Sequence, residues 1–377
     1  MRIALLPSAY APAIGGVEEL TRRLAEQLRD GGDDVEIWTI RHPADLPRNE
    51  VLDGLLVRRF TLPLPPFRPR PLARFPFDGR DALRELDAAA RQFRPDLLHV
   101  QCFSANGVYA TALGARAQLP LVVSLQGETV MDDGDIYERS MLLRTGLRVG
   151  LRRASAVTAC SGFVLDDAAR FGLREGGEVV PNGVATEGDA ELQPLAIPDG
   201  PFLLGVGRFV RKKGFDLLLE AFARLATERP DLQLVIGGDG PARADLAARA
   251  AVLGLDRRVH LPGALSRAQV AWAMANASVF VLPSRVEPFG IVVLEALRAG
   301  RPVVASSRGG AGEIVRDGEH GLVADPLDTA ALARAIARLL DDASLRERLS
   351  VAGRARVSAF DWAPVTDRYR EIYRRVA

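Results

Sequence analysis

Ser-Arg-Val-Glu-Pro-Phe-Gly-Ile-Val-Val-Leu-Glu-Ala-Leu-Arg-Ala-Gly, the segment at residues 284–300, decides the fold of the second half of the chain. Pro288 and Gly290 end the apolar run that precedes them, and the residues that follow have helical content. The segment therefore predicts a loop that carries Glu287 and a helix that carries Glu295. Most neighbours of Glu295 are apolar, and burying a carboxylate is costly unless a donor hydrogen-bonds to it. We expect Glu295 to bind hydroxyl groups.

Apolar strand-like runs alternate with helical patterns on both sides of this segment. In the second half, strands are expected at 202–206, 232–236, 258–261, 279–282, 302–305 and 321–324, with helices at 214–228, 241–253, 266–276 and 290–299, a short one near Gly312, and more from Leu327. In the first half, strands are expected at 2–6, 35–39, 55–60, 97–100, 120–125, 155–159 and 178–180, with helices at 17–29, 81–93 and 136–153. This alternation predicts an α/β fold with parallel, doubly wound sheets.

The length of 377 residues predicts two such domains. A polar segment rich in Pro and Gly, 185–200, has no periodicity and is interpreted as the linker. We therefore expect an N-terminal domain at 1–185 and a C-terminal domain at 198–359, with a last helix at about 360–377 that packs back on the first domain. The proline-rich segment 62–76 breaks the alternation, and a solvated connecting loop is favoured there over a substrate-binding loop.

Composition narrows the function classes. The net charge of +1 gives no field that would attract nucleic acid. Cys102 and Cys160 are too few for a disulfide framework and fit a reducing compartment, and neither a secretory signal nor a membrane-spanning run is present, so we expect a cytoplasmic protein. Membrane contact is peripheral at most. Arg144, Arg148 and Arg152 at helical spacing could meet an anionic surface or an acidic acceptor, but the low net charge favours a solvated helix face.

A cationic motif follows the strand expected at 202–206. Arg208 and, five residues later, Lys213 precede Gly214, which opens a helix. Only two of the 49 basic residues are lysines, and they stand side by side here. A guanidinium grips two oxygens and an ammonium neutralises a third, so the pattern suits a diphosphate. Gly-Gly-Asp-Gly-Pro at 237–241 either lets a ligand approach the backbone or is simply a strand-to-helix turn.

Competing sites are weakly supported. Dinucleotide binding requires Gly-x-Gly-x-x-Gly between a strand and a helix, and the chain has only Gly205 and Gly207 of that motif. A Walker A motif is absent. The four histidines are scattered without ligand spacing, which argues against a metal site. His99 lies on an apolar strand, where a core histidine is a better interpretation than a catalytic one.

Several motifs together resemble the family 4 retaining glycosyltransferases of GT-B fold. They are Gly-Arg-x-x-x-x-Lys-Gly-x-x-x-Leu-Leu-x-Ala-Phe at 207–222, Gly-Gly-Asp-Gly-Pro at 237–241 and Leu-Pro-Ser-Arg-Val-Glu-Pro-Phe-Gly-Ile-Val-Val-Leu-Glu-Ala at 282–296, together with Gly-Gly-Val-Glu from Gly15 and Val-Pro-Asn-Gly-Val at 180–184. The resemblance covers essentially the whole chain. It implies two Rossmann-like domains that face a cleft, in which a nucleotide sugar binds mainly to the second domain.

The resemblance also assigns the donor-binding residues of the C-terminal domain. Glu295 would accept hydrogen bonds from the ribose hydroxyls, and Glu287 would face the donor sugar. The backbone of Phe289, Gly290 and Ile291 would lie near the sugar and the phosphates. The acceptor is a hydroxyl compound that the sequence does not identify, and UDP is the expected nucleotide.

The catalytic roles implied by the resemblance need no metal and no other cofactor. Arg208 and Lys213 would hold the diphosphate and stabilise the charge that develops on it, alongside Glu287 as the third catalytic residue. Gly15 and Gly16 would let the first domain's loop approach the same phosphates. The family retains anomeric configuration, apparently by front-face attack assisted by the leaving phosphate.

The chain departs from the family pattern at Gln126. Members often carry His before Gly at this place near the donor sugar, whereas this chain reads Gln126-Gly127-Glu128. An amide can position a hydroxyl but cannot carry a proton or a charge at pH 7. Gln126 is therefore expected to bind the donor without acid–base chemistry, with Glu128 as a possible substitute. The departure keeps one alternative open, a catalytically silent GT-B protein that binds a nucleotide sugar or a glycan.

Overall fold

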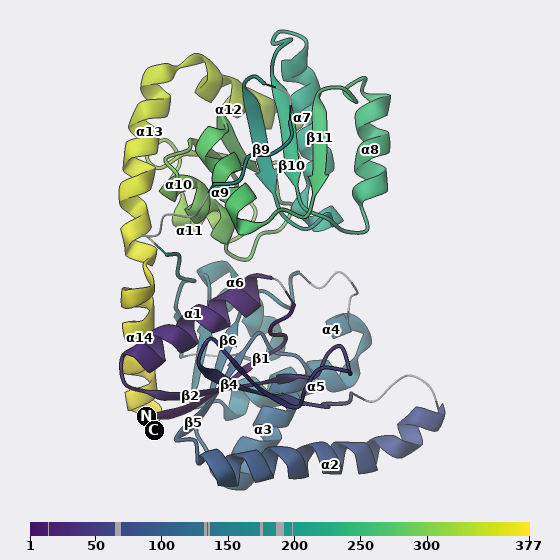
Figure 1. Cartoon of the computed structure of the whole chain (residues 1–377), viewed down its shortest axis with the longest axis vertical. Helices are drawn as coiled ribbons and strands as arrows, with labels where there is room; N and C mark the ends of the chain where they lie inside the picture. The colour runs from purple at the N-terminus through teal and green to yellow at the C-terminus, as the bar shows by residue number, and fades with distance from the viewer. Residues whose placement is uncertain are drawn as a thin grey trace. The chain divides into compact units, whose positions relative to one another are not determined.

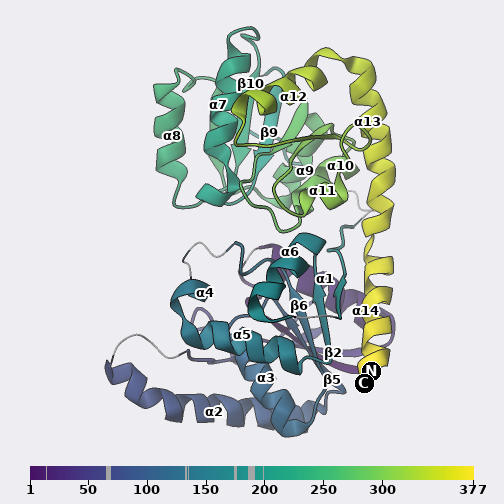
Figure 2. The same cartoon turned by 180° about the vertical axis from the view of Figure 1, so that it is seen from behind.

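The computed structural model describes residues 1–13, 15–64, 69–131, 134, 136–173, 176–185, 192–197 and 199–377, with the backbone alone at 69–76. The chain forms two compact units, shown in Figures 1 and 2. Unit 1 comprises Met1–Gly183 and Trp362–Ala377, and unit 2 comprises Val184–Asp361. Of the linker expected at 185–200, residues 186–191 and 198 lie outside the described residues.

Unit 1 contains an 8-stranded sheet in the order β3-β4-β2-β1-β5-β6-β7-β8. All neighbouring strands are parallel except β3 and β4, which form an antiparallel hairpin. The strands are β1 (Arg2–Pro7), β2 (Asp34–Ile40), β3 (Asn49–Leu52), β4 (Leu55–Phe60), β5 (Leu97–Gln101), β6 (Leu121–Leu125), β7 (Ala156–Ala159) and β8 (Gly177–Val179). Strand β3 was not predicted from the sequence. Its residues alternate between exposed and half-buried, so the strand buries little apolar surface.

Helices cover both faces of this sheet (Figures 1 and 2). Leu20, Leu24 and Leu28 are buried one turn apart on α1 (Gly16–Asp30), which packs on β1, β2 and α14. The other helices of the unit are α2 (Pro69–Phe93), α3 (Ala105–Ala117), α4 (Ile136–Arg139), α5 (Met141–Arg153), α6 (Gly162–Ala168) and α14 (Trp362–Val376). The predicted α/β fold with doubly wound parallel sheets is confirmed.

Two predictions for unit 1 were wrong. The segment expected to be a loop at 62–76 contains the start of α2, which begins at Pro69, while 65–68 lie outside the described residues. Prolines fit there because the first N–H groups of a helix have no partner within it. The single helix expected at 136–153 is two helices. Ser140 separates them and caps α5, where its side chain accepts a hydrogen bond from the Leu143 N–H.

Unit 2 contains a 6-stranded, fully parallel sheet in the order β11-β10-β9-β12-β13-β14. The strands are β9 (Phe202–Val206), β10 (Gln233–Gly237), β11 (Val259–Gly263), β12 (Val279–Leu282), β13 (Val303–Ser306) and β14 (Leu322–Ala324). The helices are α7 (Phe215–Ala226), α8 (Arg243–Val252), α9 (Arg267–Asn276), α10 (Ile291–Arg298), α11 (Ala311–Ile314), α12 (Thr329–Asp341) and α13 (Ala343–Arg356). Apolar residues from strands β9, β10 and β12 and from helices α7 and α12 form its core.

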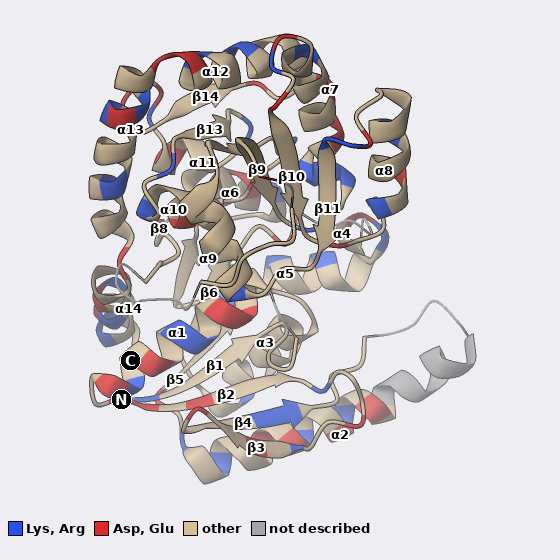
Figure 3. Cartoon of the chain, turned by 45° about the horizontal axis from the view of Figure 1, so that its top comes forward, with Lys and Arg blue, Asp and Glu red and all other residues tan. Residues whose placement is uncertain are grey.

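The chain leaves unit 2 after α13 and ends in unit 1. Tyr369, Ile372 and Tyr373 on α14 are buried in unit 1 at the spacing of one helical face. Within the described residues, no helix combines the length and the hydrophobicity that crossing a bilayer requires. Basic and acidic residues are interspersed along the helices of both units, as Figure 3 shows.

Candidate functional site

The strand order of unit 2 marks one place as the ligand crevice. From β9 the sheet continues to β10 on one side, and β12, the fourth strand in sequence, lies on the other side. The crossovers therefore run in opposite directions from this pair, and open α/β sheets bind ligands at the carboxyl ends of such strands. The segments 207–214 and 283–290 follow these two strands. Both cationic and acidic motifs predicted from the sequence fall in them.

Lys213 and Glu287 form an ion pair at this crevice. The Lys213 Nζ lies 2.8 Å from Oε2 of Glu287, and only 16% and 6% of their side chains are exposed. The Ser284 hydroxyl donates to the same carboxylate oxygen over 2.9 Å. A buried carboxylate is costly without such partners, so the ion pair and the hydroxyl together compensate the burial of Glu287.

Backbone contacts fix Lys213 in place. It ends a short 3-10 helix, Arg211–Lys213, and Gly214 follows with a φ of 68° as the cap of α7. A Cβ at Gly214 would lie 2.0 Å from the Pro283 carbonyl oxygen, so only glycine allows this approach. The Arg285 N–H donates to the Lys212 carbonyl over 2.8 Å. The segments after β9 and β12 are thus joined through their backbones.

The backbone of Glu287 is joined to the segment after β13. Its N–H donates to the Arg308 carbonyl over 3.0 Å, and its carbonyl accepts from the Gly310 N–H over 2.8 Å. Gly309, with a φ of 121°, lies so close that a Cβ there would be 2.1 Å from the Glu287 carbonyl oxygen. The position of the Glu287 carboxylate therefore depends on the segments that follow strands β9, β12 and β13.

Arg285 and Asp216 form a brace beside the pair. Both guanidinium Nη atoms reach the Asp216 carboxylate, each over 2.6 Å. Burial alone would raise the pKa of Asp216, but hydrogen bonding and charge from Arg285 outweigh it and hold that pKa below its usual value. The residue after Ser284 and the first turn of α7 are thereby clamped together. Sequence reasoning missed Ser284 and this brace, because neither belongs to a spacing typical of a site.

The other predicted donor residues of unit 2 lie along the same segments. Gly290 caps α10 with a φ of 98°, and Ile291 begins that helix. The Phe289 ring is buried and packs edge-on against Phe360, with 6.0 Å between centroids. Glu295 lies on α10 and is half-buried. The structure thus places Glu295 two turns after the Glu287 loop, on the helix that the loop opens.

Arg208 follows β9 and is exposed. Its two neighbours, Gly207 and Phe209, contact the glycine turn at 237–240. The Phe209 N–H donates to the Asp239 carbonyl over 2.8 Å. A Cβ at Gly238 would lie 1.9 Å from the Gly207 carbonyl oxygen. The close approach that these glycines permit is therefore to the protein's own backbone, which favours the structural interpretation of that turn.

Unit 1 carries a neutral polar network under the carboxyl ends of its central strands. The His99 Nδ1 lies 2.6 Å from the Tyr373 hydroxyl, and its Nε2 lies 2.6 Å from the Ser124 hydroxyl and 3.1 Å from Nε2 of Gln101. Ser124 continues to the Thr158 hydroxyl over 2.6 Å. Burial lowers the pKa of His99 to about 3, so this histidine is neutral and structural.

Gln126 ends this network. Its Nε2 donates to the Gln101 Oε1 over 3.1 Å, and its own Oε1 is buried without a partner among the described residues. The oxygens of Glu128, the possible substitute, accept hydrogen bonds from the backbone N–H groups of Phe103 and Gln126 over 2.5 and 2.7 Å. Burial raises the pKa of Glu128 to about 7 despite these hydrogen bonds.

Gly15 and Gly16 stand at the start of α1, after the carboxyl end of β1. Gly15 is the N-cap residue of α1 and has an extended backbone conformation. Because glycine has no side chain, the first N–H groups of the helix have no side-chain cap from this residue. Helix N-termini of this kind attract anions. Ile14, beside them, lies outside the described residues. Across the part of the chain that the structure describes, no group of three or more His, Cys, Asp and Glu side chains could hold a metal ion.

Comparison with known proteins identifies the family. Residues 15–183 match the glycosyl transferase 4-like domain, and residues 189–356 match the glycosyl transferases group 1. The phosphatidyl-myo-inositol mannosyltransferase of Mycobacterium tuberculosis is 31% identical over 398 residues, which cover 100% of this chain and 97% of that protein. The chain belongs to the family 4 glycosyltransferases. The family and the enzyme class predicted from the sequence are thus confirmed.

Another relative and two solved structures are also similar to the chain. The alpha-D-kanosaminyltransferase of Streptomyces kanamyceticus is 30% identical over 302 residues, 74% of this glycosyltransferase and 77% of that one. Sucrose-phosphate synthase from Thermosynechococcus elongatus superimposes with a TM-score of 0.79 and 26% identity, covering 99% and 98% of the two chains. HepE from Anabaena in complex with UDP superimposes with a TM-score of 0.75 and 24% identity over 98% and 99%. These structures confirm the GT-B fold.

Proposed function

We propose that this glycosyltransferase takes its sugar from a nucleotide-diphosphate donor that binds at the carboxyl edge of the unit 2 sheet. The observation that carries the proposal is the Lys213–Glu287 ion pair at the point where the strand order reverses. The ammonium has one anionic partner at 2.8 Å and is held by backbone contacts, so a phosphate oxygen can become a second partner without reorganising the loop.

We assign the other donor-binding roles to residues of the segments that follow β9 and β12. Arg208 and Lys213 neutralise the diphosphate as it leaves, Glu287 binds hydroxyls of the donor sugar, and Glu295 binds the ribose hydroxyls. The backbone of Phe289, which precedes Gly290 and Ile291, borders the sugar and the phosphates. On unit 1, Gly15 and Gly16 offer the uncapped N-terminus of α1 to the phosphates, and Gln126 offers an amide to a sugar hydroxyl.

Transfer is proposed to occur with retention and without a metal. The bond from the anomeric carbon to the phosphate oxygen breaks, the acceptor oxygen bonds to that carbon from the same face, and the acceptor proton passes to the departing phosphate. Lys213 and Arg208 supply the positive charge that the departing group requires. Turnover should therefore persist in excess chelator, and a requirement for added Mg²⁺ would contradict this part of the proposal.

UDP is the nucleotide to test first, because HepE, which shares the fold, is described in complex with UDP. A thermal-shift panel of UDP-, GDP-, ADP- and dTDP-sugars identifies the base, and the donor that raises the melting temperature is then tested for turnover. Cys102 and Cys160 form no disulfide, which supports a cytoplasmic enzyme. The acceptor is a hydroxyl compound still to be identified.

A catalytically silent binding protein is the second candidate. It is favoured by Gln126, whose amide cannot carry a proton and whose Nε2 donates to Gln101 within a neutral network. A silent protein would bind the donor in the thermal-shift panel without hydrolysing or transferring its sugar. Slow release of nucleoside diphosphate from the bound donor would exclude this candidate even before the acceptor is known.

A further inference from the structure

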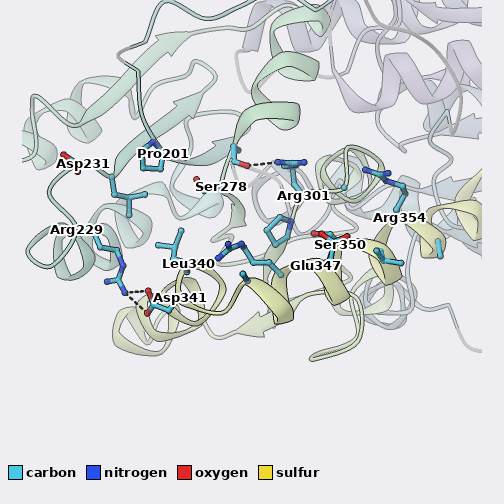
Figure 4. A pocket seen from close by; sticks show the side chains of 18 of the residues that line it. Pro201, Arg229, Asp231, Ser278, Arg301, Leu340, Asp341, Glu347, Ser350 and Arg354 are labelled. Carbon is cyan, nitrogen blue, oxygen red and sulfur yellow. Dashed lines mark hydrogen bonds and ion pairs between the residues drawn. The ribbon is translucent and has the colours of Figure 1, made fainter.

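A pocket of about 1110 Å³ lies in unit 2 at the amino ends of its strands (Figure 4). Residues just before β9, β10, β12 and β13 form one wall, and helices α12 and α13 form the other. Lys213 and Glu287 follow the carboxyl ends of β9 and β12, so this pocket lies at the opposite edge of the same sheet. It has the size of a small-molecule site and is separate from the proposed donor site.

Arg301 and Arg354 line this pocket and have no acidic partner among the residues that the structure describes. The half-buried Arg301 donates only to the backbone carbonyls of Ala277 and Ala299, each over 3.3 Å. The Arg354 side chain, on α13, makes no hydrogen bond or ion pair with the residues that the structure describes. Burial and the nearby Arg354 charge both lower the pKa of Arg301. The two guanidinium groups therefore face one space and repel each other there.

A third arginine of the pocket provides the contrast. Arg229 is joined to Asp341, with Nη2 2.7 Å from the carboxylate, as Figure 4 shows. Elsewhere in unit 2, Arg285 and Arg308 are likewise paired with carboxylates. Arg346, a fourth arginine of the pocket, also has no acidic partner among the described residues, but its Nη1 donates to the Leu339 and Leu340 carbonyls over 2.8 and 2.7 Å.

Gly300 leaves space for the Arg354 side chain next to the turn that precedes Arg301. Gly300 has a φ of 66°, and a Cβ there would lie 2.1 Å from Nη2 of Arg354. Only glycine lets the Arg354 side chain lie across the turn that carries Arg301. Ser350, one helical turn before Arg354 on α13, lines the same pocket and adds a hydroxyl donor.

Acidic and apolar groups limit the size and charge of a ligand. Asp231, Asp341 and Glu347 line the pocket as well, and Asp341 is neutralised by Arg229. A polyanion would meet Glu347 and Asp231, whereas a single oxyanion group between the two arginines would not. Apolar residues such as Leu340 and Val351 border the rest of the space.

We propose that this pocket binds a small organic oxyanion, a phosphate ester or a carboxylate, whose charged group lies between Arg301 and Arg354. The guanidinium groups would each donate to the oxyanion, which removes their mutual repulsion. The apolar border would hold the uncharged part of the molecule. Because Arg301 directly follows the turn that ends α10, the ligand would bind beside that turn without competing for the donor.

Calorimetric titration with inorganic phosphate and, separately, with acetate tests the proposal. The full chain is used with the Lys213→Ala substitution as background, so that the proposed diphosphate site does not contribute. We expect at least one of the two anions to bind, and the combination Arg301→Gln with Arg354→Gln to weaken that binding by at least about tenfold. The anion that binds more tightly tells a phosphate ester from a carboxylate.

Arg348→Gln is the matched control, because Arg348 lies on the same helix but does not line the pocket. It should leave the affinity unchanged. Circular dichroism and the melting temperature show whether each variant is folded. The proposal is overturned if neither anion binds up to about 10 mM, where millimolar sites are still detected, or if a folded Arg301→Gln, Arg354→Gln variant binds as tightly as the Arg348→Gln control.

Discussion

Both units have a buried polar cluster at the carboxyl edge of the sheet, but the Lys213–Glu287 cluster of unit 2 is charged and the His99 network of unit 1 is neutral. In unit 2, the Lys213 ammonium and the Glu287 carboxylate are 2.8 Å apart and mostly buried. In unit 1, a neutral His99 connects Tyr373 and Ser124, and no charge enters the network. The difference indicates that unit 2 is suited to an ionic ligand and unit 1 to hydroxyl groups.

The energetics of the two arrangements differ as well. Removing one partner of a buried ion pair leaves an uncompensated charge and costs about 3–5 kcal/mol. Removing one partner of a neutral buried hydrogen bond costs about 1–3 kcal/mol. Substitutions in unit 2 should therefore alter activity and stability together, whereas those in unit 1 should act mainly on stability and geometry.

Lys213→Ala should have the largest effect. It removes the charge that stabilises the leaving diphosphate and leaves the buried Glu287 with Ser284 as its remaining side-chain donor. We expect turnover with a saturating donor to fall by at least about tenfold, together with a lower melting temperature. Lys212→Ala at the neighbouring lysine is the control, with near-normal turnover. Wild-type rates in Lys213→Ala would refute the catalytic role.

Glu295→Ala should weaken donor binding while the fold persists. The lost hydrogen bonds join a carboxylate to ribose hydroxyls, which corresponds to about 10- to 100-fold in affinity. Isothermal titration with the donor nucleotide measures the effect, and the 2′-deoxy nucleotide should be affected less. Unchanged affinity with a normal melting profile would exclude the ribose assignment.

Tyr373→Phe tests the network of unit 1. It leaves Nδ1 of the fully buried His99 without its partner, which should lower the free energy of unfolding by about 1–3 kcal/mol. Tyr369→Phe is a matched control on the same helix, since its hydroxyl is 3.4 Å from Ser124 and contributes less. Denaturant titrations compare the two variants. Equal losses would show that the short His99 contact has no particular importance.

The pH dependence of Glu128 should give the smallest effect. Burial raises the pKa of Glu128 to about 7, above its unfolded value, so ionisation is less favourable in the folded state. Its contribution to stability is therefore full at low pH and declines as the pH rises toward 7. Relative to Glu128→Gln, the wild type should lose stability between about pH 5 and pH 7. A difference that is constant with pH would contradict the raised pKa.

The sequence predicted the fold class and most element positions because strands, glycine turns and helices alternate clearly around residues such as Gly214 and Gly290. It could not predict that Lys213 lies against Glu287, since these residues are 74 positions apart and meet only through the strand order of the sheet. Arg285 and Asp216 were missed for the same reason. Local signals identify which residues lie on loops, and the sheet order determines which loops meet.

The errors in unit 1 have local causes. The prolines near Pro69 indicated a loop, although proline is well tolerated in the first turn of a helix. Gln126 was recognised from its place in a motif, but its orientation depends on Gln101, His99 and Tyr373 of the last helix. A single sequence contains no signal that connects a residue of β5 to one that follows 274 positions later.

The central claim is that the ion pair of unit 2 binds the diphosphate of the donor. The most direct test compares the affinity of the nucleoside diphosphate selected by the thermal-shift panel with that of its nucleoside, in the wild type and in Lys213→Ala. We predict that the ratio of the two affinities falls by at least about tenfold in the variant, because only the diphosphate contacts Lys213. A ratio that is the same in both proteins would contradict the account.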